Sequence, residues 1–334
     1  YDAIFSALGN DDDIEQVFLG ISDGDVFRST VSRMLPDHAG GTFEGISLGS
    51  RAFARQLADP PSPVYSIGGV DIILSSALWS SDKDAGETAA YDLGGFGFSA
   101  AGEVDTKLGA FGLSATWMWN EYDQLGGDQS ANSDTYELGA YWRGHWGGFT
   151  AFGRGSIGKV DADGWRLFRY TLDGKDVERQ IQGDWGGTLM TASAGMAYEI
   201  GGSGAFFARP AVSADYVSLD EDGYTETGGS EALNLTVEDR KSDEFAVNGG
   251  MTVGINFTGN GPRDENWFRT EVEGGWREVV GGELGSTTAS FEGGTPFTLD
   301  PEQRSNGWFA RLRALGGSDM FEMSGEVGAE DRND

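Results

Sequence analysis

The chain has 334 residues with 54 acidic and 23 basic side chains, which gives a formal net charge of −31, and it contains no cysteine. The lack of cysteine excludes thiol catalysis, thiolate metal sites and disulfides, and so acidic a chain is a poor partner for nucleic acid. No segment has the run of about 18 apolar residues that a membrane-spanning helix needs, and the mean hydropathy is −0.36. The 54 glycines and 12% aromatic residues favour an all-β chain of many strands joined by turns.

Two short helices are predicted near the start of the chain. Asp11–Asp13 offers capping carboxylates ahead of a first apolar series at helical spacing, which consists of Ile14, Val17, Phe18 and Ile21. A second apolar series follows Asp25 and ends at Pro36, because a helix does not continue through proline. His38 comes just after this helix and is predicted to be a cap or a solvated residue.

A third helix is predicted over residues 42–58. It is rich in Gly, Ser and Ala, and it carries Arg51 and Arg55 four residues apart on one face. Three prolines within residues 60–63 then exclude both helix and ladder pairing. Residues 1–63 are therefore predicted to form a helical linker region, and residues 64–334 a strand-built domain.

After residue 63 the hydrophobic pattern changes to a period of two, which is typical of strands. Strands are predicted at residues 68–81, 89–103, 107–120, 134–146, 149–160, 184–200, 204–219, 241–258, 265–280, 305–315 and 319–331. One face of these strands is apolar, and the other is polar or charged. The charged face holds Arg209, Asp215, Arg269, Glu271, Glu273, Arg277, Glu322 and Glu326. The alternation alone fits a soluble sandwich as well as a membrane barrel.

The lengths of the connections separate these two folds. Short connections follow the second, fourth, sixth and tenth predicted strands, whereas longer polar ones follow the odd-numbered strands, including 160–183, 220–240 and 281–304. Outer-membrane barrels have short periplasmic turns and long external loops. The sequence therefore predicts a transmembrane outer-membrane β-barrel of about 12 antiparallel strands, with the charged face in the lumen and these three stretches on the cell surface.

One strand is missing from this count. Eleven strands are predicted, but a bacterial single-chain barrel needs an even number, so the last, closing strand is predicted to be absent from this chain. Without it, the strand at residues 319–331 would keep an open ladder edge.

Enzymatic function is not predicted, and neither a catalytic residue, a cofactor nor a metal site is assigned. Only His38 and His145 could act as imidazole bases, and His145 lies beside a short turn on the side assigned to the periplasm. Asp220–Asp222 resembles a fragment of a calcium loop, but the later ligands are not at the required spacing. These acidic residues are predicted to be solvated.

Several stretches resemble the translocator domains of autotransporters, the type V secretion proteins, especially those of alphaproteobacteria. Residues 34–41 and 49–52 look like the helical linker that precedes the barrel in that family. The family's central strand and loop are similar to residues 215–219, 223–229 and 233–237. The stretch before its last strands is similar to residues 276–277 and 291–297. The similarity covers nearly the whole chain in the right order.

The resemblance implies a twelve-stranded barrel in the outer membrane of a Gram-negative bacterium, which exports and anchors an N-terminal passenger. Its implied partners are this passenger, the barrel-assembly machinery, and outer-membrane lipid with lipopolysaccharide. Two other functions stay open at this stage, a passive pore or adhesive surface barrel with acidic loops, and a barrel hydrolase.

The helix over residues 42–58 is expected to thread through the lumen. It is slim and tethered close to the first strand, and Arg51 and Arg55 could meet the lumen-facing carboxylates in a poorly solvated space. The alternative is a helix docked outside the barrel on the periplasmic turns.

Overall fold

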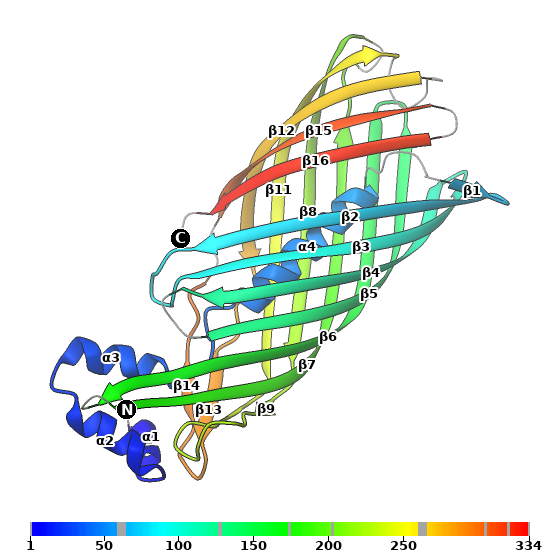
Figure 1. The fold of residues 1–334 in the computed structure, drawn as a ribbon. Helices are drawn as coiled ribbons and strands as arrows, with labels where there is room; N and C mark the ends of the chain where they lie inside the picture. The colour runs from blue at the N-terminus through cyan, green and yellow to red at the C-terminus, as the bar shows by residue number, and fades with distance from the viewer. Residues whose placement is uncertain are drawn as a thin grey trace.

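The computed structural model describes residues 2–58, 65–125, 129–172, 175–201, 204–259, 266–303, 306–318 and 321–332. An antiparallel sheet curls around one helix, and three further helices lie at one end of it (Figure 1). The helices are α1 (Asp2–Leu8), α2 (Asp12–Gly20), α3 (Gly24–Ser32) and α4 (Gly41–Ala58). None of the described helices is long and apolar enough to cross a membrane. The prolines of residues 60–63 lie outside the described residues.

The large sheet confirms the predicted all-β fold, because each of the eleven predicted strands is present. They are β2 (Val70–Lys83), β3 (Tyr91–Thr106), β4 (Gly109–Gln124), β5 (Gln129–Trp146), β6 (Phe149–Leu172), β7 (Lys175–Tyr198), β8 (Phe206–Glu221), β11 (Arg240–Thr258), β12 (Asn266–Gly281), β15 (Gly307–Ser318) and β16 (Phe321–Arg332). Neighbours in this order pair antiparallel, and the short β1 (Tyr65–Ile67) adds a twelfth strand beside β2.

The two faces of the sheet are inverted relative to a soluble protein. Apolar side chains point outward, as for Phe206 (71% exposed) and Val327 (67%), whereas Arg209 and Glu271 point inward and are largely buried. A soluble sandwich would bury the apolar face instead. This inversion is what a lipid-facing surface and a polar lumen require.

The sheet has two open edges among the described residues. β16 pairs only with β15, and the first and eleventh predicted strands do not pair with each other. A groove of about 1460 Å³ separates β2 from β16. The need for a closing strand stays a prediction.

Two of the three predicted external loops contain additional strands, and the third is not a loop. The stretch 160–183 was expected to be irregular, but β6 and β7 continue through it as one long hairpin. The other two stretches carry a second, four-stranded sheet, made of β9 (Tyr224–Thr225), β10 (Leu235–Val237), β13 (Thr287–Phe291) and β14 (Phe297–Leu299). The prediction of an irregular 160–183 loop was wrong because this hairpin is stabilised by contacts that are distant in sequence.

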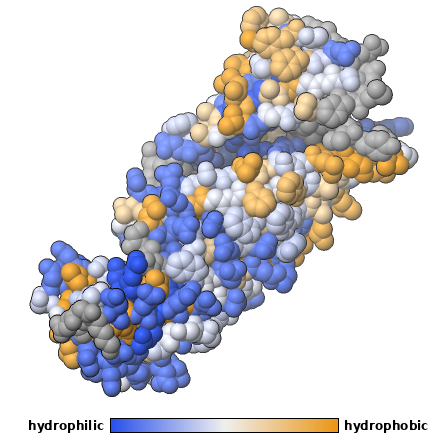
Figure 2. All heavy atoms as spheres, viewed as in Figure 1, coloured by the Kyte–Doolittle hydropathy of each residue, from blue (hydrophilic) through white to orange (hydrophobic). Residues whose placement is uncertain are grey.

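These contacts come from α1, α2 and α3, which form a cap on the tips of β6 and β7 and on the small sheet. Ile14 and Phe18 of α2 are buried against Phe168 of β6, Ile181 of β7 and Phe291 of β13 in the largest apolar core of the described residues. This end of the molecule is mostly hydrophilic on its surface, whereas hydrophobic residues gather toward the opposite end of the strands (Figure 2). The cap therefore has an apolar core under a hydrophilic surface, as water-soluble domains do.

Capping residues explain where α2 and α3 begin. Asp11 accepts hydrogen bonds from the backbone N–H groups of Asp13 and Ile14, as its position predicts. The cap of α3 is Asp23, and the N–H groups of Val26 and Asp25 hold the pKa of Asp23 below its usual range.

Candidate functional site

Helix α4 lies on the concave side of the sheet, against β2, β3 and β4 (Figure 1). Three of its glycines, Gly41, Gly45 and Gly49, contact inward-facing side chains so closely that a Cβ would meet them. At Gly45 a Cβ would lie 3.0 Å from the Asn120 side chain, and at Gly49 it would lie 2.8 Å from Met118 Sδ. Four helical residues rise about 6 Å, which nearly equals the advance of two strand residues. The glycines of α4 therefore match alternate residues of β4.

A second face of α4 carries the two predicted arginines. Arg51 Nη1 lies 3.3 Å from Glu330 on β16, and Arg55 Nη2 lies 3.7 Å from Glu326 on the same strand. The Arg51 side chain is only 7% exposed, so its charge depends on this kind of pairing. The sequence did not single out Glu330, because it lies at the edge of an apparent terminal loop.

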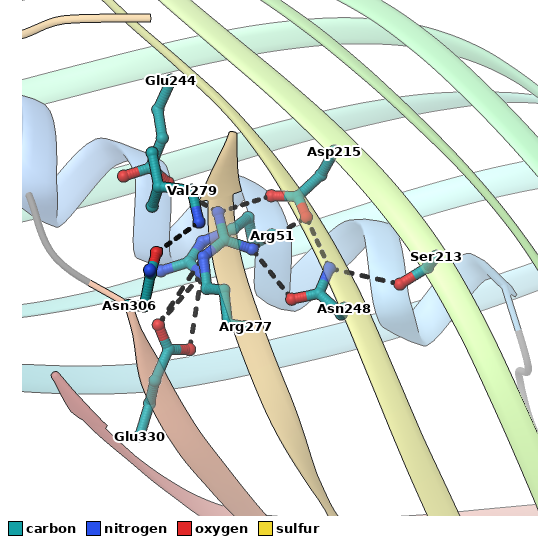
Figure 3. Close-up of polar contacts among 9 residues, drawn as sticks. All are labelled: Arg51, Ser213, Asp215, Glu244, Asn248, Arg277, Val279, Asn306 and Glu330. Atoms are coloured by element: carbon teal, nitrogen blue, oxygen red, sulfur yellow. Dashed lines mark hydrogen bonds and ion pairs between the residues drawn. The ribbon is translucent and has the colours of Figure 1, made fainter. Parts of the chain in front are cut away.

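The close-up in Figure 3 shows how Arg277 joins the same cluster. Its two Nη atoms each lie 2.8 Å from an oxygen of Asp215, a bidentate contact, and Nη2 also donates to Glu244 at 2.5 Å. Asn248 donates to Asp215 at 2.8 Å. Strands β8, β11 and β12 are thereby linked beside the helix.

The other predicted lumen residues form a second group of ion pairs. Glu271 lies 2.8 Å from both Arg209 and Arg269, and it is 2% exposed. Glu273 pairs with Arg311 at 3.2 Å, and Glu326 pairs with Arg313 at 3.1 Å. Glu322 is on β16, but its side chain lies outside the described part of the chain.

A third group was missed by the sequence. Glu137 on β5 is fully buried, pairs with Arg154 at 2.5 Å, and accepts a hydrogen bond from Ser50 of α4 at 3.1 Å. Its signal was available in the alternation of β5, where Glu137 stands between the outward-facing Tyr136 and Leu138. A single charged residue between two outward-facing apolar residues marks the inner face of the strand.

One prediction for the loops was also wrong. Glu221 was expected to be solvated with its acidic neighbours, but it is 4% exposed. Arg240 donates to both of its oxygens at 2.8 and 2.9 Å, and Trp185 donates at 3.2 Å. Glu221 is the last residue of β8, so its side chain turns inward with the alternation of that strand.

The candidate site is therefore a wall of paired charges around a helix. The described residues contain no group of three or more His, Asp or Glu side chains that could hold a metal ion. His38 lies 3.2 Å from the Pro36 carbonyl through Nδ1, and His145 is exposed. Such an arrangement can hold a polypeptide segment in the lumen by ion pairs and close packing.

Fold and site together define an outer-membrane barrel that holds a helix of its own chain. A family model described as the autotransporter beta-domain matches residues 76–315, which is most of the chain. The chain belongs to this family. It is thus an outer-membrane translocator domain of a Gram-negative bacterium, of the kind that exports and anchors a passenger. Family membership decides against the passive pore and adhesive barrel considered from the sequence.

One solved structure supports the same fold, and a second is reported beside it. The translocator domain of the autotransporter NalP from Neisseria meningitidis is 15% identical with a TM-score of 0.58, over 88% of this chain and 98% of that one. The beta domain of the Bordetella autotransporter BrkA is 15% identical with a TM-score of 0.49, over 80% of this chain and 94% of that one. A search of curated protein sequences finds no match.

Proposed function

We propose that α4 is the tail of the exported segment, which stays in the lumen as a plug after export, and that residues 2–40 lie on the cell surface. The observation that carries this proposal is the set of contacts on three sides of the helix. Ser50 contacts β5, Arg51 contacts β16, and Gly45 packs on β4. These contacts support a helix inside the barrel.

The positions of the cap and of β2 support the same direction of passage. The cap rests on the tips of β6 and β7, at the end of the barrel with the long connections, whereas β2 begins at the end with the short turns (Figure 1). A chain that runs from the cap through α4 to β2 therefore crosses the lumen once. Long connections belong on the outside of such barrels.

The domain acts in this proposal as a non-enzymatic conduit. Its buried carboxylates Glu137, Glu271 and Glu221 are each paired with arginine, which suits a structural role more than proton transfer. The outward apolar band would contact lipid and, in the outer leaflet, lipopolysaccharide. Insertion of such a sheet would require the cell's barrel-assembly machinery, and the passenger is the exported partner.

Planar-bilayer conductance tests the plug. Deletion of residues 2–58 is expected to give a much larger and steadier current than the whole chain gives. Deletion of residues 2–35 alone serves as the matched control, because it removes the cap and leaves α4 in place. An unchanged current after the longer deletion would show that α4 does not fill the lumen.

A further inference from the structure

The segment between α3 and α4 is held from two sides of the barrel mouth. Tyr122 on β4 donates to the Asp37 carboxylate, with 2.7 Å between Oη and Oδ1. Thr287 on β13 and Arg240 on β11 donate to the Asp37 carbonyl oxygen at 3.1 and 3.5 Å. Four strands of the large sheet lie between β4 and β11, so Asp37 joins distant parts of the wall.

The wall orients its donors through contacts of its own. Arg240 is fixed by the bidentate contact with Glu221, and its Nη1 also donates to Thr287 at 3.0 Å. Glu221 is itself held by Trp185. None of these contacts involves the α3–α4 segment, so the donors are already in place before it binds. Little conformational entropy of these side chains is therefore lost on binding.

The wall around Asp37 also limits which residues can follow it. Ala39 is buried in an apolar cluster that includes Tyr91 and Tyr122. Gly40 has a φ of +79°, which favours glycine, and a Cβ on Gly41 would overlap the Tyr122 ring. The places of Ala39, Gly40 and Gly41 therefore accept only small residues, and a segment that is bulkier at these three positions does not fit.

We propose that Tyr122, Arg240 and Thr287 form a binding site for the chain's own Asp37–Gly41 segment, which stops the exported chain in one register. The proposal rests on the plug proposed above and adds what fixes its position. A shift of α4 by one turn would move the segment by about 5.4 Å. That displacement breaks the hydrogen bonds to Asp37 and moves Ala39 out of the apolar cluster that it forms with Tyr91 and Tyr122. The site thus defines where α4 comes to rest.

Single-channel recording of the whole chain tests this site with Asp37→Ala, Tyr122→Phe and the double variant. Loss of a hydrogen bond to a charged group is expected to raise the frequency of open events by about tenfold or more. Because both groups act through one contact, Tyr122→Phe is expected to have this effect in the wild-type chain and none in the Asp37→Ala background. Asp25→Asn is the matched control, since Asp25 is an exposed acid of α3 that pairs with Arg28 on its own helix.

Two results would overturn the site while leaving the plug intact. One is an open frequency in both single variants equal to that of the wild type, although deletion of residues 2–58 still opens the pore. The other is an equal effect of Tyr122→Phe in both backgrounds. If Asp37→Ala does not fold, Thr287→Val removes a different donor to the same residue, and a wild-type open frequency would count equally against the site. A deletion of residues 2–58 that opens no current would instead refute the plug.

Discussion

The close packing of Gly49 against the wall predicts that even one added methyl group loosens α4. A Cβ at this position would lie 2.6 Å from the Trp79 ring and 2.8 Å from Met118 Sδ, closer than real Cβ contacts. Overpacking of this kind costs about 1–3 kcal/mol, whereas replacing glycine by alanine inside a helix gains about 1 kcal/mol. Gly49→Ala is therefore expected to destabilise the seated helix by about 1 kcal/mol.

Amide hydrogen exchange measures this local free energy directly, because α4 can open without global unfolding. A loss of about 1 kcal/mol should make exchange of the α4 amides roughly fivefold faster. Gly45→Ala is the matched control, since its Cβ would lie 3.0 Å from the Asn120 side chain, which needs to move only slightly. Exchange that is slower in Gly49→Ala than in the wild type would show that helix propensity outweighs the packing, and the reasoning would fail.

Two further predictions concern the cap and the loops. Ile14→Ala removes a fully buried side chain and is expected to destabilise the docked cap by about 2–5 kcal/mol, seen as faster tryptic cleavage there, whereas Leu19→Ala, at a position 79% exposed, should leave the rate unchanged. The hydrogen bond from Lys83 holds the pKa of Glu302 below its usual range. The ionised Glu302 therefore stabilises the folded loop fully above the ordinary pKa of a glutamate, and this stabilisation is lost as the pH falls through the lowered pKa of Glu302. Protection of the Glu87 amide, which donates to Glu302, should fall only in that acidic window, and Glu302→Gln should abolish the dependence; a protection factor that is constant with pH would contradict this.

The alternation of the strands made most of the barrel predictable. Successive side chains of a strand point to opposite faces, so the sequence of one strand is enough to assign its two faces. Arg209, Glu271 and Arg277 could therefore be placed on the inner face before any pairing was known. The loop lengths then separated a barrel from a sandwich. Local pattern was enough because the membrane imposes the same rule on every strand.

The cap and the mouth could not be predicted in the same way. Their stability depends on contacts between residues far apart in the sequence, such as Phe168 with the α2 helix and Asp37 with Thr287, which is 250 positions away. The short strands β9, β10, β13 and β14 have two to five residues, too few for a period to be visible. Asp37 gave no signal beyond the resemblance of residues 34–41 to the family's linker, since a lone acid after a proline is an ordinary turn residue.

The distribution of charge explains why α4 is stable against the inner face of the sheet. Of the 23 basic residues 18 are arginine, and the inward clusters described above contain arginine only. A guanidinium group can join two carboxylates at once, as Arg277 does with Asp215 and Glu244, whereas an ammonium group lacks that planar fork. Arg51 and Arg55 extend this pairing from the helix to Glu330 and Glu326. Without the helix, Glu330 would lose its contact with Arg51 and Glu326 its contact with Arg55, so the wall itself favours the state in which α4 is seated.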